Sequence, residues 1–187
     1  MKLSFFEKLI VKKIKSSKNK SFVELCINKE ADLFNCFSMF GNSFTNNTKI
    51  NDKIMDYIEA ETRSIDIRDA LIISVKIVDE IKYDLNFIEK LIKEYAERKI
   101  LMLNKKIHKL NIHSFILAFI GMMLIGITHI LRILEKRYSI NEFIIVMSWV
   151  FMWKAVDLMV FDKTGILKEK GVLMKIYYSE IFIDKTL

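Results

Sequence analysis

One uncharged stretch limits what this chain can fold into more than any other feature. Between Lys109 and Arg132 lie 22 residues without a single Asp, Glu, Lys or Arg, although 28% of the 187 residues are charged. A run of this length can cross the hydrocarbon core of a bilayer as one helix. Its two glycines, Gly121 and Gly126, lack the four-residue spacing that lets two membrane helices approach closely. The sequence therefore predicts a first membrane span at about residues 112–131.

A second span is predicted at about residues 143–161. Its first eleven residues are uncharged, and Lys154 and Asp157 then interrupt the apolar run. The core helix of a soluble protein is the alternative interpretation of this segment. Only a short connecting loop, residues 132–142, separates it from the first span. We therefore predict that residues 111–162 form a transmembrane helical hairpin.

The distribution of basic residues predicts how the hairpin is threaded through the membrane. Residues 98–109 carry five Lys or Arg and no acid, residues 163–175 carry four, and residues 132–142 carry three. Lys and Arg near the ends of spans are enriched on the cytoplasmic side. We therefore expect a multi-pass protein of the cell membrane with both termini in the cytoplasm and the loop outside.

The same basic residues predict a partner, the anionic lipid bilayer. Residues 1–20 carry seven Lys and one Glu with apolar residues at helical spacing. This pattern is typical of an amphipathic helix in the membrane interface, and a surface helix of a soluble module fits it equally well. Residues 21–97 carry fifteen acidic and nine basic side chains, which argues against nucleic acid as a partner. The expected contacts with lipid headgroups are Lys8, Lys12, Lys13, Lys15, Arg98, Lys99, Lys105, Lys106 and Lys109.

A small α/β module with a connecting helix is predicted for residues 21–110. Residues 70–78 are rich in Ile and Val with the two-residue alternation of a strand. Asn51 or Asp52 can cap the helix that follows them. Residues 81–109 have helical spacing that continues towards the first span, so this helix should link the module to the membrane.

The tail, residues 163–187, is expected to complete this module. Gly165 and Gly171 are interpreted as breaks in regular structure, and residues 176–183 are aromatic and β-branched, as strands often are. Because the tail is expected on the same side of the membrane as the module, its strand can pair with the strand at 70–78. The predicted fold class is thus an α+β membrane protein, a two-helix transmembrane hairpin with a small cytoplasmic α/β module built from both ends of the chain.

No motif predicts catalysis, and no cofactor or metal is expected. Cys26 and Cys36 are ten residues apart and do not form a Cys-x-x-Cys pair, so reduced bystander thiols are favoured over redox or metal roles. The charged cluster between Glu59 and Asp69 contains both signs and is typical of a solvated surface, with a metal or substrate site as the alternative. We therefore expect that the protein is not an enzyme.

The sharpest local feature is an aromatic and charged segment in the second span. Trp149 and Trp153 are typical of the aromatic belt at a membrane interface, and Lys154 and Asp157 are close enough on a helix to pair. In one interpretation the pair lies at the cytoplasmic interface, with Lys154 extended towards the headgroups. In the other it lies inside protein, where ionisable groups of a span mark a functional site. The sequence favours the interface interpretation and keeps the other as the alternative.

With these residues the chain resembles a group of small two-span membrane proteins from low-GC Gram-positive bacteria. The resemblance covers about residues 50–187, and its most specific part is the tryptophan-rich segment W-V-F-M-W-K-A-V-D at 149–157. The group usually has an acidic residue where this chain has Lys154, so the chain departs from the group there. The resemblance implies the two-span topology and brings no activity, substrate or partner with it.

Two classes of function agree with these features. The first is a non-enzymatic, membrane-anchored module that senses, scaffolds or regulates at the cytoplasmic face. The alternative is a membrane-active effector or a small oligomeric channel, for which Lys154 and Asp157 are the only support. Besides the bilayer, the expected partners are a second copy of the chain or a membrane or cytoplasmic protein that the sequence does not identify.

Overall fold

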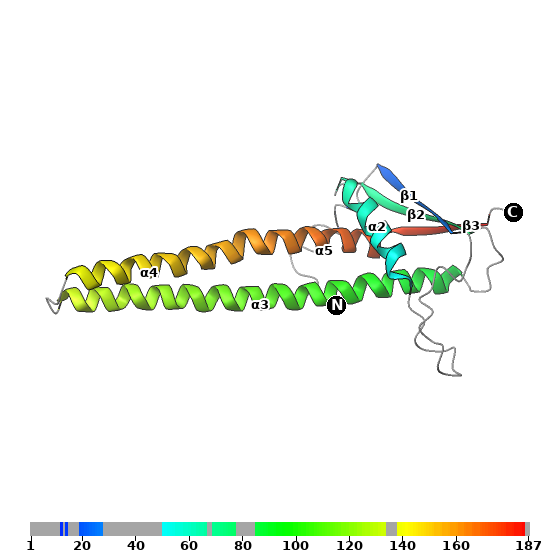
Figure 1. The fold of residues 1–187 in the computed structure, drawn as a ribbon. Coiled ribbons are helices and arrows are strands. Elements are labelled where there is room, and N and C mark those ends of the chain that lie inside the picture. The colour runs from blue at the N-terminus through cyan, green and yellow to red at the C-terminus, as the bar shows by residue number, and fades with distance from the viewer. Residues whose placement is uncertain are drawn as a thin grey trace, which may run out of the picture. The chain divides into compact units, whose positions relative to one another are not determined.

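The chain forms two compact units, which are described separately. A computed structural model describes residues 12, 14, 19–27, 50–66, 69–77, 85–133 and 138–185. Unit 1 comprises Met1–Ile100 and Lys170–Leu187, and unit 2 comprises Leu101–Glu169. The elements follow the order β1 (Lys20–Ile27), α2 (Asp52–Ser64), β2 (Ala70–Ile77), α3 (Leu85–Ile133), α4 (Tyr138–Asp157), the π-helical turn η2 (Leu158–Asp162), α5 (Lys163–Tyr177) and β3 (Glu180–Lys185) (Figure 1).

The predicted amphipathic helix near the N-terminus falls almost wholly outside the described residues. Lys12 and Ile14 are helical, and Lys12 is exposed whereas Ile14 is buried. Lys8, Lys13 and Lys15 lie outside the described residues, so their expected contacts with headgroups stay predictions.

Unit 1 is built on a three-stranded parallel sheet with the order β1-β2-β3 (Figure 1). Ile73 of β2 is in register with Val23 of β1 on one side and with Ile181 of β3 on the other. Parallel neighbours need long crossover connections. The connection from β1 to β2 contains α2, and the connection from β2 to β3 contains α3, α4 and α5. In the order of the chain, the whole of unit 2 therefore lies between β2 and β3, which are neighbours in the sheet.

The pairing of β2 with β3 confirms the prediction that a strand within residues 70–78 pairs with a strand of the tail. The predicted bounds of the tail strand, 176–183, are wrong at the start. Ile176 and Tyr177 form the end of α5, and β3 begins at Glu180. Ile176 is fully buried in the core of unit 1, and this packing outweighs the preference of β-branched and aromatic residues for strands.

One face of the sheet carries the core of unit 1. Successive strand residues point to opposite faces, so alternate residues of β1 and β2 pack against α2, the first part of α3 and the end of α5. The opposite face leaves Phe22 and Phe182 exposed. The buried core consists of Val23, Leu25, Ile27, Ile50, Met55, Ile58, Leu71, Ile73, Val75, Ile88, Ile92, Ala96 and Ile176.

Helix α2 begins at the predicted cap. The side-chain oxygen Oδ1 of Asn51 accepts a hydrogen bond from the backbone N–H of Lys53 at 3.1 Å. This bond satisfies one of the amide groups that the first helical turn leaves unpaired. Met55 and Ile58 on the following turns are fully buried, so the cap fixes where the core-facing side of α2 starts.

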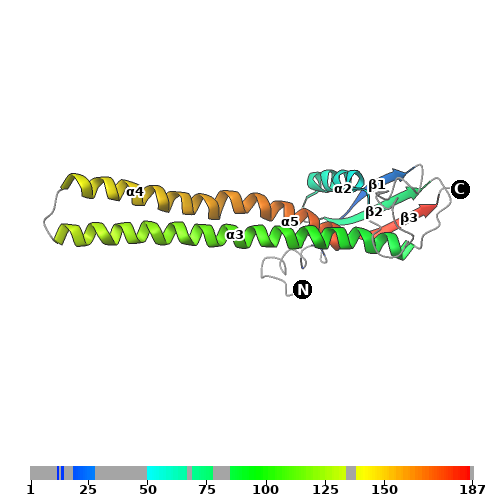
Figure 2. The ribbon, with the colours of Figure 1, turned by 60° about the horizontal axis from the view of Figure 1, so that its bottom comes forward.

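Unit 2 is a helical hairpin. Within it α3 and α4 lie side by side and run in opposite directions (Figures 1 and 2). Helix α3 extends to Ile133 and α4 begins at Tyr138. The hairpin was predicted, but helical structure occupies most of the expected loop at 132–142.

The predicted breaks at Gly165 and Gly171 are wrong. Both glycines lie inside α5, and helical structure is continuous from Tyr138 to Tyr177 through the π-helical turn η2. Neither has the positive φ with which a glycine ends a helix. A glycine inside a helix costs only about 1 kcal/mol, which the burial of α5 residues such as Leu173 offsets.

Candidate functional site

A seven-residue repeat organises the α3 side of the hairpin. Leu103 is buried, and four further leucines, each seven residues after the last, are half-buried. A second series with the same spacing is small or polar and buried. Alternating steps of three and four residues describe a coiled-coil seam. The two series are Leu103, Leu110, Leu117, Leu124 and Leu131, and Ser114, Gly121 and Thr128.

Helix α4 presents small residues to this seam with the same period. The hydroxyl of Ser114 donates a hydrogen bond to the backbone carbonyl of Ala155 at 3.1 Å. A Cβ atom at Gly121 would lie 2.8 Å from Cγ of Met152 and 3.2 Å from the carbonyl oxygen of Ser148, so the helices can approach this closely only at a glycine. Small residues permit such packing between membrane helices. The α4 residues in the seam, none more than 5% exposed, are Asn141, Ser148 and Ala155.

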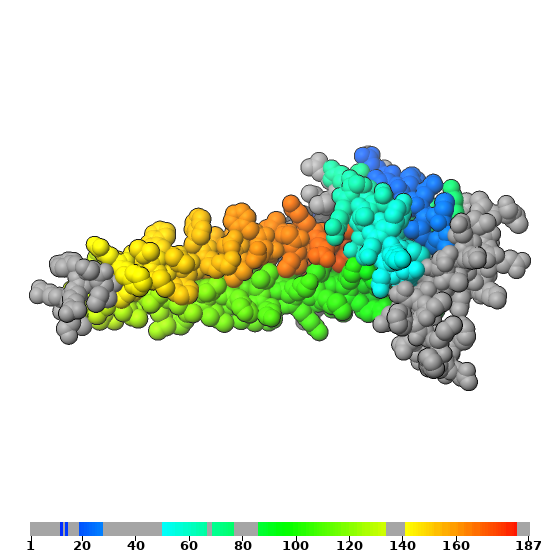
Figure 3. All heavy atoms as spheres, viewed as in Figure 1, coloured from blue at the N-terminus to red at the C-terminus, as the bar shows by residue number. Residues whose placement is uncertain are grey.

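The outward sides of the hairpin are apolar. Phe115, Phe143 and Phe161 are 75%, 67% and 69% exposed, and many other large apolar side chains of α3 and α4 are exposed with them. Figure 3 shows one face of the surface that α3 and α4 form. Two helices are long and apolar enough to cross a membrane, and only 17% and 11% of their most apolar windows are buried. Small and polar residues alternate with leucines in the seam, whereas large apolar side chains cover the outside, and a water-soluble domain rarely exposes so much contiguous apolar surface.

The polar pair predicted in the second span lies on this outward side. The Nζ atom of Lys154 donates a hydrogen bond to Oδ2 of Asp157 at 2.6 Å, and the two side chains are 55% and 38% exposed. Trp149 and Trp153 are also exposed, and the four residues line one shallow groove of α4. The structure therefore brings the four residues together and does not bury the pair between α3 and α4.

The contacts between the helices fix the level of this pair along the hairpin. Ala155 is level with Ser114 because of the hydrogen bond between them. Ser114 is five residues beyond Lys109, a distance of about 7–8 Å along a helix. Lys154 and Asp157 therefore lie near the Lys109 end of the uncharged stretch and not at its middle. This position favours the interface interpretation.

Four of the basic residues predicted to contact lipid headgroups have exposed side chains on α3, at Lys109 or before it. Lys105, Lys106 and Lys109 are exposed, and none of the ion pairs among the described residues involves them. Arg98 is exposed, and its Nε atom donates a hydrogen bond to the carbonyl of Glu94 at 3.3 Å. All four cationic groups are accessible to anions.

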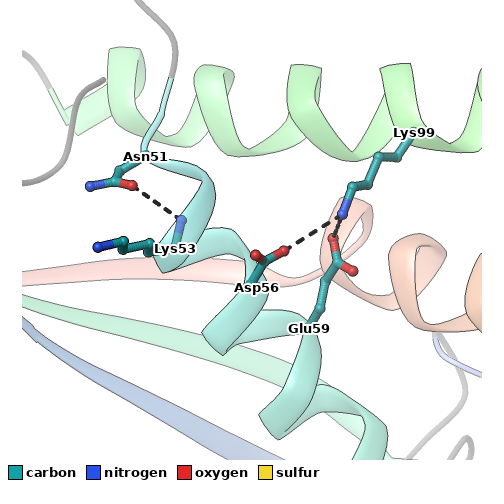
Figure 4. A network of polar contacts seen from close by, with 5 residues as sticks. All are labelled: Asn51, Lys53, Asp56, Glu59 and Lys99. Carbon is teal, nitrogen blue, oxygen red and sulfur yellow. Dashed lines mark hydrogen bonds and ion pairs between the residues drawn. The ribbon is translucent and has the colours of Figure 1, made fainter. Parts of the chain in front are cut away.

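Lys99, in unit 1, has a structural partner. Its Nζ atom lies 2.7 Å from Oε1 of Glu59 and 3.9 Å from Oδ1 of Asp56 (Figure 4), and it also lies 4.9 Å from the ring centre of Tyr95. Burial disfavours the charged amine, but hydrogen bonds with Glu59 and Tyr95 outweigh it and raise the pKa of Lys99 above its ordinary value. Glu59 is only 5% exposed, so it does not belong to the solvated surface predicted for this cluster.

Lys175, also in unit 1, likewise makes structural hydrogen bonds. It is 2% exposed, and its Nζ atom donates hydrogen bonds to the backbone carbonyls of Ile65, at 3.4 Å, and Asp66. These carbonyls follow the end of α2, where backbone acceptors lack helical partners. Burial lowers the pKa of Lys175 below its ordinary value, although Asp69 and Asp66 oppose the shift. The ammonium group thus ties the α2–β2 connection to α5.

The described residues offer little else for chemistry. Among them, no group of three or more His, Cys, Asp or Glu side chains could hold a metal ion. Cys26 is an exposed free thiol on β1, and Cys36 lies outside the described residues.

No protein-family model, curated protein or solved structure matches the chain. The resemblance to the two-span group stays a prediction. Sequence reasoning missed the seam of the hairpin because it tested the glycines only for a four-residue spacing. The seven-residue repeat of Leu103–Leu131, with Ser114, Gly121 and Thr128 between the leucines, is the signal that finds it.

Proposed function

We propose that this chain is a two-pass membrane protein that holds a non-enzymatic α/β module at the cytoplasmic face, where the module senses, scaffolds or regulates a membrane-associated partner. The spans are α3 from about Leu110 to Leu131 and α4 from about Glu142 to Asp157. Unit 1 is the module, and its sheet is completed only by the strand that follows the second span.

The observation that carries this proposal is the exposed apolar surface of the hairpin around a seam that contains small residues. Ser114, Gly121 and Ser148 pack inside, whereas phenylalanine, isoleucine, methionine and tryptophan side chains face outwards. In water such a surface favours aggregation. In hydrocarbon it faces lipid, and the small inner residues supply the close packing that associates membrane helices.

A non-enzymatic role is supported by how unit 1 uses its buried polar groups. Lys99 pairs with Glu59, and Lys175 donates to the carbonyls at the end of α2. Both lysines thereby hold helices and connections of the module in place. These contacts suit a binding or scaffolding module whose exposed faces meet a partner.

Cysteine labelling tests the topology. In a chain with Cys26 and Cys36 replaced by serine, a cysteine at Ser139 should react with a membrane-impermeant maleimide in intact cells. A cysteine at Ser16 or Lys185 should react only after the cells are permeabilised. Recovery of the protein in the membrane pellet after carbonate extraction is the control for insertion. The opposite labelling pattern contradicts the proposal.

The effector or channel alternative makes a different prediction. Lys154 and Asp157 neutralise each other on the outward side of α4, so the described residues give no free charge to a conducting path there. Induced expression of the full chain should leave the membrane potential of the host cell unchanged. Depolarisation that is lost in a Lys154→Leu/Asp157→Leu variant would support the alternative instead.

A further inference from the structure

A shallow groove opens between the two helical arms of unit 2 at the Lys109 end of the uncharged stretch. It has a volume of about 300 Å³. Leu110 of α3, Leu158 of η2 and Ile166 of α5 give it an apolar floor. Lys106, Lys109 and His113 complete its lining, and no acidic side chain contributes to it. We call this feature the Lys109 groove.

The polar groups of the Lys109 groove are suited to an anion. The side-chain ammonium groups of Lys106 and Lys109 take part in none of the ion pairs found among the described residues. His113 lies one helical turn further along, and its Nδ1 atom is 2.9 Å from the carbonyl oxygen of Lys109. Since a carbonyl oxygen only accepts, Nδ1 donates this bond, and Nε2 of the neutral ring is an acceptor. The two ammonium groups are therefore the donors that suit an anion.

The position of the groove identifies the source of the anion. Lys109 is the last charged residue before 22 uncharged ones, so in a bilayer it lies at the level of the lipid phosphates. Leu110 and Leu158 then lie close to the level where the acyl chains begin, whereas Ile166, about 12 Å further along its helix than Leu158, lies beside the headgroup. Basic pockets between membrane helices on the cytoplasmic side are known binding places for anionic headgroups.

We propose that the Lys109 groove binds one anionic phospholipid of the cytoplasmic leaflet, with Lys106 and Lys109 at its phosphate and Leu110 and Leu158 against its first acyl carbons. This inference rests on the membrane insertion of the hairpin. It goes beyond general attraction to a negative surface, because a bound lipid has a fixed stoichiometry and depends on the groove lysines more than on other lysines.

Native mass spectrometry of the full chain in detergent can count bound lipids. With equal additions of phosphatidylglycerol or phosphatidylcholine, the unaltered protein should retain one phosphatidylglycerol and little phosphatidylcholine. The double variant Lys106→Gln/Lys109→Gln should bind phosphatidylglycerol about tenfold or more weakly, since each lysine contributes on the order of a fivefold change in affinity. The matched control Lys105→Gln/Lys168→Gln removes the same charge outside the groove and should bind as the unaltered protein does.

Each other outcome is informative. Equal weakening in both double variants means that only the surface potential attracts lipid, and this overturns the site. Equal retention of the two lipids by the unaltered protein also overturns the site, whatever the variants show. Inorganic phosphate that displaces phosphatidylglycerol at the same concentration indicates a site for free anions and also overturns the lipid assignment. If carbonate extracts the protein from membranes, the proposed function itself is contradicted. Failure of the lipid site and failure of the proposed function are therefore distinguishable.

Discussion

Two lysines of unit 1 hold their ammonium groups in opposite electrostatic surroundings. Lys99 faces the buried carboxylate of Glu59, and its pKa is raised. Lys175 faces backbone carbonyls, and burial lowers its pKa. The first lysine compensates a buried charge, whereas the second is itself the buried charge. Substitutions at the two positions should therefore change the stability of unit 1 by different mechanisms and by different amounts.

Replacing Lys99 with Met should leave the carboxylate of Glu59 buried without its cation. An unsatisfied buried group of this kind costs about 1–3 kcal/mol, so the free energy of unfolding of unit 1 should fall by that amount. Pulse proteolysis in urea, with the full chain in a mild detergent, measures the change. The second variant Lys99→Met/Glu59→Gln should recover much of the loss, because the orphaned charge is removed.

Lys93 provides the matched control for Lys99. It pairs with Glu89 on the same helix, and both side chains are about one third exposed. Exposed pairs contribute about 0–1 kcal/mol, so Lys93→Met should change stability little. An equal loss in Lys93→Met and Lys99→Met would show that the burial of Glu59 does not decide the effect.

Lys175 should make the stability of unit 1 depend on alkaline pH. Its pKa in the folded protein is below the ordinary lysine value of about 10.4. Between these two pKa values the unfolded chain binds a proton that the folded protein has lost, so the free energy of unfolding rises with pH. The slope can reach at most about 1.4 kcal/mol per pH unit.

Pulse proteolysis at several pH values up to 10.4 measures this slope. The variant Lys175→Met should lack the contribution, whereas Lys168→Met, which removes an exposed lysine of the same helix, should keep it. Identical pH profiles for the three proteins would contradict the assignment to Lys175.

At the scale of elements, the seam of the hairpin depends on Gly121. Its Cβ position is 2.8 Å from Met152 and 3.2 Å from a backbone oxygen, so Gly121→Leu must push α3 and α4 apart. Overpacking of this kind typically costs about 1–3 kcal/mol. Unfolding in mixed dodecylmaltoside–SDS micelles, followed through the fluorescence of Trp149 and Trp153, should shift to lower SDS.

The other glycine of the span provides the control for this prediction. Outside the local helix backbone, no atom lies within 4 Å of a Cβ at Gly126, so Gly126→Leu should unfold at nearly the same SDS fraction as the unaltered protein. Equal shifts in the two variants would mean that a general change in helix propensity, and not the contact with Met152, explains the loss.

The sequence predicted some elements well because their signals are local. The cap at Asn51, the alternation over 70–78 and the uncharged run after Lys109 each depend on a few neighbouring residues. Strand β1 was missed, since both Phe22 and Val23 are apolar and the alternation is weak. The course of α5 through Gly171 depends on packing in unit 1, which no local signal reports. The Lys99–Glu59 pair joins residues 40 positions apart, and composition alone assigned both to surfaces.

At the scale of the whole molecule, unit 1 is completed from two distant parts of the chain. Strand β3 pairs with six residues of β2, and the half-buried Ile181 packs against the core. A chain ending at Ser179 lacks β3, so β2 becomes an edge strand with unpaired backbone groups. Its unit 1 should be cleaved faster by trypsin under native conditions than that of a control chain ending at Lys185, which keeps the strand. Equal half-lives of the two chains would contradict a structural role for β3.

The insertion of unit 2 between β2 and β3 also has a consequence during biosynthesis. The ribosome makes β1 and β2 before either long apolar helix, and it makes β3 only after both. The sheet can therefore close only after the second apolar helix has been made. If the hairpin spans the membrane as proposed, β3 reaches β2 only when the second helix has returned the chain to the side on which β2 lies. A nascent chain whose second helix did not cross would then keep β2 as an edge strand with unpaired backbone groups.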